Sequence, residues 1–393
     1  MKYINEVDIA QKRVFIRCDF NVPMDENQNI TDDNRIRQAL VTIKYTIDNK
    51  AKVILASHLG RPNGKKNPKY SLAPVAKRLS TLLDRKVDFI DDCIGEKVKD
   101  KINAMHVSDV LLLENLRFYE GEKKNSVAFA EKLLELFDVY VNDAFGVCHR
   151  KHASVYALPE IAHIAVGGFL LKKEIEYFNK VLNAKEKPFV AVIGGAKVSG
   201  KLECLKNLIN KADKMIIGGA QAFTFLKALG YNVGKSLVEN ELLTSAGKIM
   251  KLAKEKNVKF YLPVDFICSK DISDTLNYVT TTYQEIPDSM MGLDIGPATS
   301  ELFKEALADA KIIMWNGPMG VFEVDAFAAG TKSIAKAIGQ LQAVSVVGGG
   351  DTADAVKAAG ESENMSYIST GGGASLEILE GKTLPAIAVL EAK

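Results

Sequence analysis

Basic side chains recur just after short apolar segments in the first half of the chain. The set consists of Arg35, His58, Arg61, Arg117, His149 and Arg150. The planar guanidinium of arginine carries several N–H donors that match the oxygens of phosphates and carboxylates. Several such groups in one place predict a site for a small ligand with more than one negative charge. A surface ion pair explains any single arginine equally well, but it accounts poorly for the whole set.

Two more polar residues, Asp19 and Asn21, stand at the end of the first apolar segment, 14–20. Their side chains suit a hydroxyl group on the same ligand. His149 and His152 have the spacing of a metal-binding pair on one helix face. No third ligand accompanies them, so contact with an anion or capping of a helix is the favoured interpretation.

The second half of the chain has glycine turns at the corresponding places. After an apolar segment, Gly195 and Lys201 stand at the spacing of the phosphate-binding loop G-x-x-x-x-G-K. Leu202 occupies the position where Ser or Thr would hold magnesium, which disfavours a true loop of that kind. A glycine turn that leads into a helix, with Lys197 and Lys201 one helical turn apart, still suits a polyphosphate.

Further glycine turns follow in the second half. They are Gly218–Gly219, Gly292–Pro297, Asn316–Gly320, Gly348–Gly350 and Gly371–Gly373. The last two stand between a strand and a helix start, where backbone N–H groups favour an anion. Asp351 directly follows one of them and is the expected carboxylate for a nucleotide-bound Mg²⁺.

A dinucleotide-binding enzyme is the rival interpretation of these turns. Gly348, Gly350 and Ala353 fit the fingerprint G-x-G-x-x-A. That function also needs an acidic residue at the end of the next strand to bind a ribose. The segment 367–370 has none, so hydride transfer is disfavoured.

Strand-like and helix-like segments alternate along the whole chain. The strand-like segments are 14–20, 52–58, 87–90, 110–113, 139–141, 189–193, 214–217, 259–262, 312–315, 343–347 and 367–369; helix-like segments include 71–83, 127–137, 199–209 and 333–338. Alternation of this kind, with almost uniformly apolar strands, predicts parallel sheets with helices on both faces. We therefore expect an α/β fold of doubly wound, Rossmann-like sheets, in which ligands bind beyond the carboxyl ends of the strands.

The stretch 167–187 separates the basic half from the glycine-rich half. Its apolar residues at helical spacing are Leu171, Ile175, Phe178 and Leu182. Glycines precede it and Pro188 follows it, which marks the ends of a helix. We interpret it as a helix that joins two ligand-binding domains with a cleft between them. A crossover helix inside one large domain is the alternative.

Length and composition limit the class of protein. A chain of 393 residues favours two domains. A net charge of +2 indicates no nucleic acid or membrane surface as a partner. No apolar run is long enough for a bilayer, and the start lacks a secretory signal pattern. The five cysteines are scattered, which disfavours disulfides or a zinc site and fits the cytoplasm.

Seven ordered motifs resemble those of the phosphoglycerate kinase family over essentially the whole chain. They are Asp19–Pro23, Ser57–Pro62, Leu113–Phe118, Gly194–Val198, Trp315–Glu323, Gly348–Thr352 and Ser369–Ser375. The resemblance implies ATP-dependent, reversible phosphoryl transfer between 3-phosphoglycerate and 1,3-bisphosphoglycerate. It implies a monomer with a substrate domain of 1–167 plus 384–393, a connecting helix of 168–187 and a nucleotide domain of 188–383. Ala220 and Gln221 stand where the family more often has Gly and Met.

The resemblance also assigns site residues. The 3-phosphoglycerate ligands would be Asp19, Asn21, Arg35, His58, Arg61, Arg117 and Arg150. The Mg²⁺–ATP or Mg²⁺–ADP ligands would be Gly195, Lys197, Lys201, Gly292, Asn316, Glu323, Gly349, Gly350, Asp351 and Thr352, with Asp351 on the metal.

The expected mechanism needs no activated nucleophile, because positioning and charge stabilisation dominate phosphoryl transfer. We expect Arg35 and Lys197 to neutralise the moving phosphoryl group, helped by backbone N–H groups around Gly372, once the two domains close about the connector. A nucleotide-dependent binding module without turnover is the remaining alternative.

Overall fold

The computed structural model describes all residues, 1–393, and the chain clusters into two compact units. The first unit contains Met1–Glu176 and Thr383–Lys393, and the second contains Tyr177–Lys382. Each unit holds a six-stranded, all-parallel sheet, as the alternation of strand and helix segments predicts. No helix has the length and apolar character that crossing a bilayer requires.

The sheet of the first unit has the strand order β3-β4-β2-β1-β5-β6. Its strands are β1 (Arg13–Cys18), β2 (Lys52–Ala56), β3 (Asp88–Ile90), β4 (Val110–Leu113), β5 (Val139–Asp143) and β6 (Ala165–Gly167). Since β2 and β5 flank β1 and lead to opposite edges, the chain changes direction at β1. In open sheets such a point creates a crevice at the carboxyl ends of the strands.

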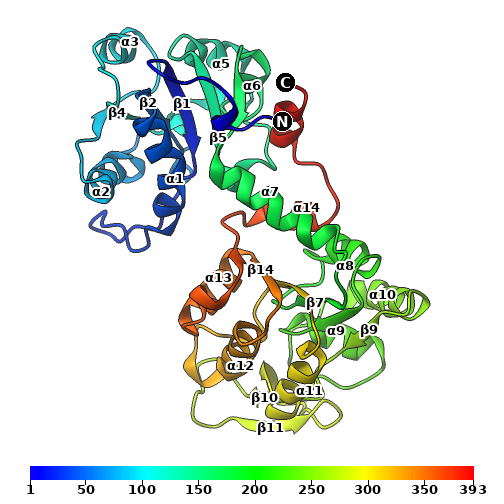
Figure 1. The fold of residues 1–393 in the computed structure, drawn as a ribbon. Helices are drawn as coiled ribbons and strands as arrows, with labels where there is room; N and C mark the ends of the chain where they lie inside the picture. The colour runs from blue at the N-terminus through cyan, green and yellow to red at the C-terminus, as the bar shows by residue number, and fades with distance from the viewer. The chain divides into compact units, whose positions relative to one another are not determined.

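Helices cover both faces of this sheet (Figure 1). They are α1 (Asn34–Asp48), α2 (Ala73–Leu83), α3 (Glu96–Asn103), α4 (Glu120–Lys123), α5 (Val127–Leu134), α6 (Ala157–Ile161) and α15 (Pro385–Glu391). One face packs Val14 and Ile16 of β1 against Ile43 of α1 and Leu79 of α2. Strand side chains alternate between faces, so Phe15 lies on the other side, where its ring stacks on Tyr140.

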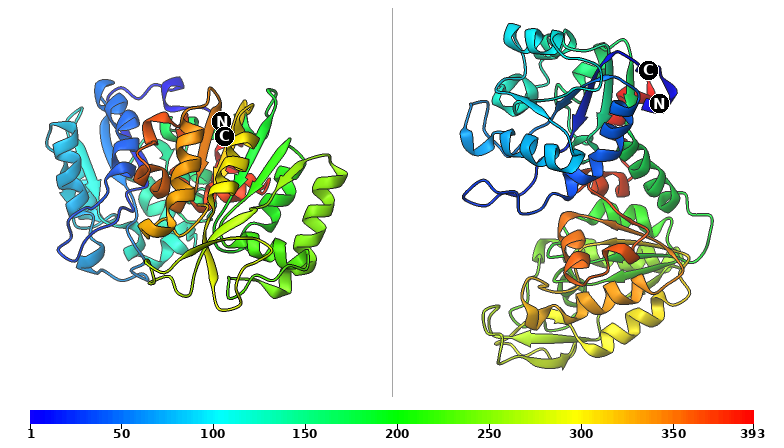
Figure 2. Two further views of the ribbon diagram at one scale, coloured as in Figure 1. Left: turned by 90° about the horizontal axis from the view of Figure 1, so that it is seen from below. Right: turned by 60° about the vertical axis from the view of Figure 1, so that its left-hand side comes forward.

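The two ends of the chain lie side by side in the first unit (Figures 1 and 2). Tyr3 forms a β-bridge with Gly167, and α15 packs on α6 and β6. Ala386 at the start of α15 donates a backbone hydrogen bond to the carbonyl of Cys148 at 3.1 Å. The last residues of the chain are therefore part of the first unit's structure.

The second unit has a parallel sheet in the order β15-β14-β13-β7-β8-β9 and a small antiparallel sheet in the order β11-β10-β12. The strands are β7 (Phe189–Ile193), β8 (Lys214–Ile217), β9 (Lys259–Tyr261), β10 (Asp265–Ser269), β11 (Val279–Thr282), β12 (Met291–Ile295), β13 (Ile312–Asn316), β14 (Val344–Gly348) and β15 (Tyr367–Ile368). Here the order changes direction at β7 and β13, the two central strands.

The helices of the second unit are α8 (Leu202–Ile209), α9 (Gln221–Ala228), α10 (Leu243–Glu255), α11 (Pro297–Leu307), α12 (Ala329–Gly339), α13 (Gly350–Ala358) and α14 (Gly373–Leu379). Helices α11 and α12 lie side by side on one sheet face (Figures 1 and 2), where Phe303 and Ile334 pack near Trp315 of β13. Helix α7 (Phe169–Leu182) begins in the first unit and ends in the second.

Every segment predicted as a strand overlaps a strand of the structure, but some strands were missed and two predictions were wrong in detail. The small antiparallel sheet and β6 were not predicted. Gly292, expected in a glycine turn, lies within β12. The predicted helix 199–209 begins only at Leu202, with Lys201 as its N-cap residue, so Lys197 and Lys201 are not on one helical turn.

Candidate functional site

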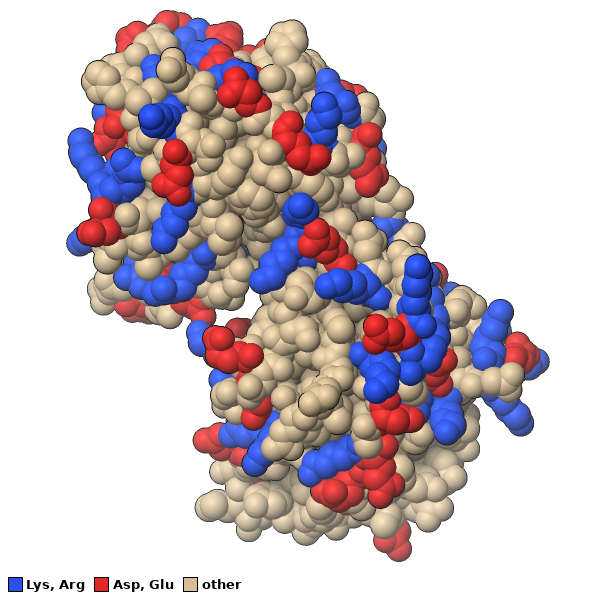
Figure 3. Space-filling view, in the orientation of Figure 1, with Lys and Arg blue, Asp and Glu red and all other residues tan.

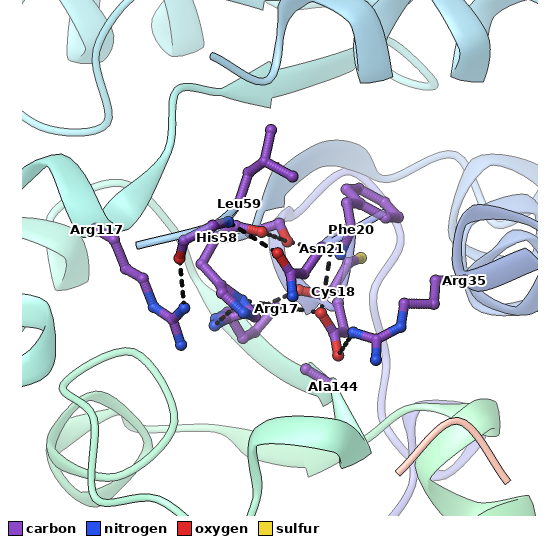
Figure 4. Close-up of polar contacts among 12 residues, drawn as sticks. Arg17, Cys18, Phe20, Asn21, Arg35, His58, Leu59, Arg117 and Ala144 are labelled. Atoms are coloured by element: carbon purple, nitrogen blue, oxygen red, sulfur yellow. Dashed lines mark hydrogen bonds and ion pairs between the residues drawn. The ribbon is translucent and has the colours of Figure 1, made fainter. Parts of the chain in front are cut away.

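The candidate site of the first unit lies where β1, β2, β4 and β5 end. Asp19 and Asn21 follow β1, His58 follows β2 and Arg117 follows β4 (Figure 4). Parallel strands bring these separate segments to one edge of the sheet. The structure thus brings together four residues that are almost 100 positions apart at the extremes.

Hydrogen bonds link the loops after β1, β2 and β4 through Gly60. Its N–H donates to Oδ1 of Asn21 at 2.8 Å, and its carbonyl accepts from Arg117 at 2.7 Å (Figure 4). Gly60 has a φ of +61°, and a Cβ there would meet the ring of Tyr70 at 2.3 Å. Only glycine fits this backbone conformation and this space, so it fixes Asn21 and Arg117 relative to each other.

Arg117 is almost completely buried, yet most of its donors are unused. One terminal nitrogen binds Gly60, while Nε and the other terminal nitrogen have no hydrogen-bond partner. Burial, and then the charges of Arg17 and Arg150, lower the pKa of Arg117 to about 10. A buried cationic fork with free donors is costly unless an anion completes it.

Asp19 holds Arg35 at the edge of this cluster. Oδ2 of Asp19 accepts from Arg35, in the first turn of α1, at 2.7 Å. Oδ1 accepts from the backbone N–H of Asn21 at 3.2 Å. The side chain of Arg35 is one-third exposed, and its guanidinium has donors left for a ligand.

Two histidines after β5 complete the cluster. Nδ1 of His149 and Nδ1 of His152 are buried without a partner, and Arg150 donates from Nε to Nε2 of His149 at 3.1 Å. Burial first, and then the charge of Arg117, lower the pKa of His152 to about 3. Neutral rings with a free nitrogen fit anion contact, and the structure has no group of three or more His, Cys, Asp or Glu side chains arranged to hold a metal ion.

Two buried charged residues of this region were not singled out in the sequence. Arg17, within β1, and Glu122, in α4, are fully buried and lie 3.8 Å apart. Arg17 also lies 3.2 Å from Nδ1 of His58. The sequence signal that could have found this pair was an arginine inside an apolar strand.

The predicted ligand Arg61, in contrast, is exposed and forms no hydrogen bond or ion pair.

In the second unit, glycines let three strand ends approach closely. Gly194 after β7 donates to the carbonyl of Asn316 at 2.9 Å, and Gly195 donates to that of Pro318 at 2.8 Å. A Cβ on Gly194 would lie 2.1 Å from the Pro318 oxygen, and one on Gly219 would lie 2.4 Å from the Gly195 nitrogen. These glycines are needed for backbone contact rather than for a turn alone.

Lys201 lies under the Gly194 turn. Its ammonium donates to the carbonyls of Gly194 at 2.6 Å and of Asn316 at 3.0 Å. Burial lowers the pKa of Lys201 to about 8, and the charge of Asp351 opposes this only in part. With two carbonyl partners and no paired carboxylate, the ammonium has one donor left for an anion.

The Gly348–Gly350 segment lies beside the end of β13. Asn316 donates from its side chain to the carbonyl of Gly348 at 2.9 Å, and Thr352 accepts from the N–H of Gly317 at 2.6 Å. Gly349, with a φ of +95°, caps α13, and Asp351 in the first turn is exposed and forms no ion pair. The expected residues of this segment thus surround the start of a helix.

The other predicted nucleotide ligands are more dispersed. Lys197 and Glu323 are exposed, without a hydrogen bond or ion pair. Gly292 packs against the ring of Phe223, which a Cβ would approach to 2.2 Å. Gly372, with a φ of +47°, caps α14. Gln221 is fully buried and donates to the carbonyls of Ile193 and Gly194, so it supports the Gly194 turn.

Residues 4–382 match the model of the phosphoglycerate kinase family. The chain is 58% identical over 392 residues to the phosphoglycerate kinase of Geobacter metallireducens, covering all of this chain and 98% of that protein. It is 53% identical to that of Aquifex aeolicus at the same coverage.

Solved structures give the same result. The structure of phosphoglycerate kinase from Coxiella burnetii matches 99% of this chain and 98% of its own, with a TM-score of 0.90 and 43% identity. That of Pyrococcus horikoshii phosphoglycerate kinase matches all of this chain and 98% of its own, with a TM-score of 0.86 and 33% identity. Neither of the two alternative functions, a dehydrogenase and a binding module without turnover, is favoured by these matches.

Proposed function

The chain belongs to the phosphoglycerate kinase family and catalyses glycolytic phosphoryl transfer between 1,3-bisphosphoglycerate and ADP, and we propose that its two units divide this task. The first unit binds 3-phosphoglycerate through the basic cluster. The second binds ADP or ATP on the glycine segments. This assignment extends the family function to named residues of this chain.

The observation that carries the proposal is the set of buried donors without partners in the first unit. Arg117 has two unused guanidinium nitrogens, and His149 and His152 each have an unused ring nitrogen. Buried polar groups normally have hydrogen-bond partners. A phosphate or carboxylate of the substrate supplies acceptors for all of them. Arg35, Arg61 and Arg150 add charge, and Asp19, Asn21 and His58 add contacts to the rest of the molecule.

Nucleotide binding in the second unit is supported by three features. The N–H groups at the start of α13, around Gly349 and Gly350, favour phosphate oxygens. Lys201 keeps a spare ammonium donor beside the Gly194 turn, and Lys197 is exposed in the loop after β7. Gly195, Asn316 and Thr352 hold the strand ends in register. Gly292 and Glu323 are the proposed contacts to base and ribose.

Magnesium is proposed to accompany the nucleotide at Asp351. Mg²⁺ is usually held by one or two carboxylates together with substrate phosphates and water. A single exposed carboxylate at the start of α13 fits that donor set. Asp351 would hold the ion, which would supply positive charge to offset part of the charge of the phosphates. The chain's own contribution is to hold Asp351 beside the N–H groups that bind the same phosphates.

For the chemical step, the chain supplies position and positive charge. A carboxylate oxygen of 3-phosphoglycerate attacks the terminal phosphoryl group of ATP in line, or ADP attacks the acyl phosphate in reverse. Arg35 and Lys197 neutralise the moving group, with help from the N–H groups around Gly372. We propose that the two ligand-bearing units close to bring the reactants together and exclude water.

We further propose that the protein works as a cytoplasmic monomer. All five cysteines are buried as free thiols, which suits a reducing compartment. On the face shown in Figure 3, basic and acidic side chains are interspersed, which indicates no broad surface for nucleic acid or membrane. Light scattering of the purified protein tests the monomer.

Hydrogen exchange with each ligand tests the division of the task. We expect 3-phosphoglycerate to slow exchange in the loops after β1, β2, β4 and β5. Mg²⁺–ADP should slow exchange around the Gly194 turn and the start of α13. A coupled assay of ATP consumption with 3-phosphoglycerate checks that the preparation is active. Protection of the glycine segments by 3-phosphoglycerate alone would refute the assignment of ligands to units.

A further inference from the structure

Two histidines of the basic cluster each turn one ring nitrogen toward an arginine. The partners are Arg17 for Nδ1 of His58 and Arg150 for Nε2 of His149. We propose that Arg17 and Arg150 are positioning residues that fix His58 and His149 in opposite neutral tautomers. Each ring then presents an N–H to the anion bound by the first unit. This inference rests on the proposed binding of 3-phosphoglycerate there.

The tautomer of His58 follows from the chemistry of Arg17. Its guanidinium nitrogen lies 3.2 Å from Nδ1, and arginine can only donate. Nδ1 must therefore offer its lone pair, and the ring hydrogen must be on Nε2. Oδ1 of Asp19 lies 3.9 Å from Nδ1, beyond hydrogen-bond distance, so this carboxylate does not take a proton from that nitrogen.

Several buried partners hold Arg17 in place. It is fully buried in β1; its Nε donates to Oγ of Ser154 at 2.8 Å, and a terminal nitrogen donates to the carbonyl of Cys18. Glu122 accepts from Oγ of Ser154 at 2.6 Å and from its N–H at 2.9 Å. The buried carboxylate lies 3.8 Å from Arg17, so it balances the charge and fixes the guanidinium beside His58.

His149 shows the reverse arrangement. Nε of Arg150 donates to Nε2 at 3.1 Å, so Nε2 is the acceptor and the hydrogen is on Nδ1. That Nδ1 is buried and has no hydrogen-bond partner. A buried N–H without an acceptor is unfavourable by itself, and an anion in the cluster would relieve it.

Double protonation of either ring is opposed by its surroundings. It would place a ring N–H against an arginine N–H. Burial, followed by the charges of Arg17, Arg117 and Arg35 and by His152, lowers the pKa of His58. Burial and the charge of Arg150 lower the pKa of His149, although Asp19 and the backbone of Gly146 act in the opposite direction. Both rings are therefore neutral donors at neutral pH.

The two rings consequently contribute hydrogen bonds of fixed direction rather than titrating charges. The Arg17 and Glu122 pair acts through His58 and does not itself meet the ligand. The Nδ1–H form of His149, the less common of the two tautomers, is the spectroscopic signature expected when Nε2 accepts from Arg150. It makes the proposal open to direct measurement in the unmodified protein.

Nuclear magnetic resonance on the full chain with ¹⁵N-labelled histidine provides the test. The chain has five histidines, and His58→Gln and His149→Gln assign the two signals. We expect the Nε2–H pattern for His58 and the Nδ1–H pattern for His149 at pH 7. An Nδ1–H pattern for His58, an Nε2–H pattern for His149, or a doubly protonated form of either would overturn the proposal.

Substitution of the arginines sharpens the result. Arg17→Met should leave His58 as a mixture of tautomers and weaken 3-phosphoglycerate binding about 10-fold, the scale of one hydrogen bond. Arg17→Lys keeps a donor and should retain the tautomer. Arg150→Met should release His149 to the commoner form. Should Arg17→Met fail to fold, the unmodified protein and Arg150→Met still decide the matter.

Addition of 3-phosphoglycerate separates this inference from the proposed function. We expect the ligand to shift the Nε2–H signal of His58 and the Nδ1–H signal of His149. Correct tautomers with no shift on either ring would refute the ligand assignment and, with it, the purpose proposed for the two arginines. A shift on rings with the wrong tautomers would refute only the positioning role.

Discussion

Arg117 differs from the other arginines of the first unit because it has buried guanidinium nitrogens without a hydrogen-bond partner. One nitrogen binds Gly60 at 2.7 Å, and two others are buried without partners. Arg117→Lys keeps the charge but removes the fork. We expect KM for 3-phosphoglycerate to rise about 10- to 100-fold, the range for charge-assisted hydrogen bonds, in steady-state kinetics.

Arg13→Lys is the matched control for that substitution. Arg13 begins β1, at the strand end opposite to the cluster, and pairs with Asp138 at 2.7 Å. The same change there should leave KM unaltered. Equal effects of the two substitutions would show that Arg117 acts through stability rather than through binding.

Lys201 is expected to take up a proton when the nucleotide binds. Its pKa is lowered to about 8 by burial, so in the free protein it loses its proton as pH rises through 8, whereas the unfolded chain keeps it to about 10.5. Its contribution to stability therefore increases with pH across that window. A phosphate at the ammonium favours the charged form and raises the pKa again.

Calorimetry at pH 8.5 measures this uptake. The apparent enthalpy of ADP binding should differ between buffers of different ionisation enthalpy, by an amount that gives a fraction of one proton. Lys201→Met should remove the difference, while Lys206→Met, on the exposed face of α8, should not. Identical enthalpies in all buffers for the unmodified chain would contradict the prediction.

The sequence predicted the charged residues at strand ends but not the buried ion pair inside the first unit. Asp19, His58 and Arg117 stand directly after apolar segments, and the sheet brings such positions together, so their grouping was predictable. Arg17 lies inside an apolar strand, which signals burial, but nothing local shows which charge pairs with it. Its partner Glu122 is over 100 residues away, in a helix of four residues, and only the tertiary structure joins them.

At the scale of elements, the strands of the two parallel sheets were predictable apart from β6, and the strands of the small antiparallel sheet were not. Strands such as β4 and β7 are continuous apolar segments, which signal burial on both faces. Strand β11, Val279–Thr282, has mostly exposed residues and three threonines, and β6 has only three residues. Gly292 was predicted in a turn because glycine is usual there, but it lies in β12. Glycine is needed in this strand because Phe223 fills the space that a side chain would occupy.

Asp143 at the end of β5 couples the first unit to the start of α7. It accepts from the N–H of Leu171 in the first turn of that helix at 3.1 Å. Burial raises the pKa of Asp143 to about 7, more than the hydrogen bonds from Thr42, Leu171 and Leu170 lower it. The folded protein thus holds a proton that the unfolded chain has lost, and this contribution to stability disappears as pH rises through 7.

Asp143→Asn removes this titration. We expect the melting temperature of the variant, relative to the unmodified protein, to increase from pH 5 to pH 8, with a change in free energy on the order of 1–3 kcal/mol. Asp138→Asn is the control, because Arg13 holds the pKa of Asp138 low and keeps it charged over this range. A constant difference for Asp143→Asn across the range would show that the carboxylate is already ionised.

At the scale of the whole molecule, the chain closes its first unit with its last residues. Leu390 of α15 is fully buried, and α15 packs on α6 and β6. Leu390→Ala should cost about 2–5 kcal/mol, as other large-to-small core substitutions do. Val389→Ala, a half-buried neighbour on the same helix, should cost much less.

Hydrogen exchange would show which elements Leu390→Ala destabilises. Peptides of α6 and β6 should exchange faster in Leu390→Ala, while peptides of β13 and β14 in the second unit should not change. Uniform acceleration in both units would mean that the molecule unfolds as one cooperative body rather than as two.

The division of ligands between units makes a final prediction about independence. Arg117→Lys should raise Kd for 3-phosphoglycerate and leave Kd for ADP unchanged in binary complexes, and Lys201→Met should do the reverse. Because the two residues belong to separate units, the change in binding free energy of the double variant should equal the sum of the two single changes for each ligand, within about 0.5 kcal/mol. Calorimetric titration of all four proteins with each ligand alone provides the measurement. If either substitution weakened the other ligand as much as its own, a shared binding site would have to replace two separate ones.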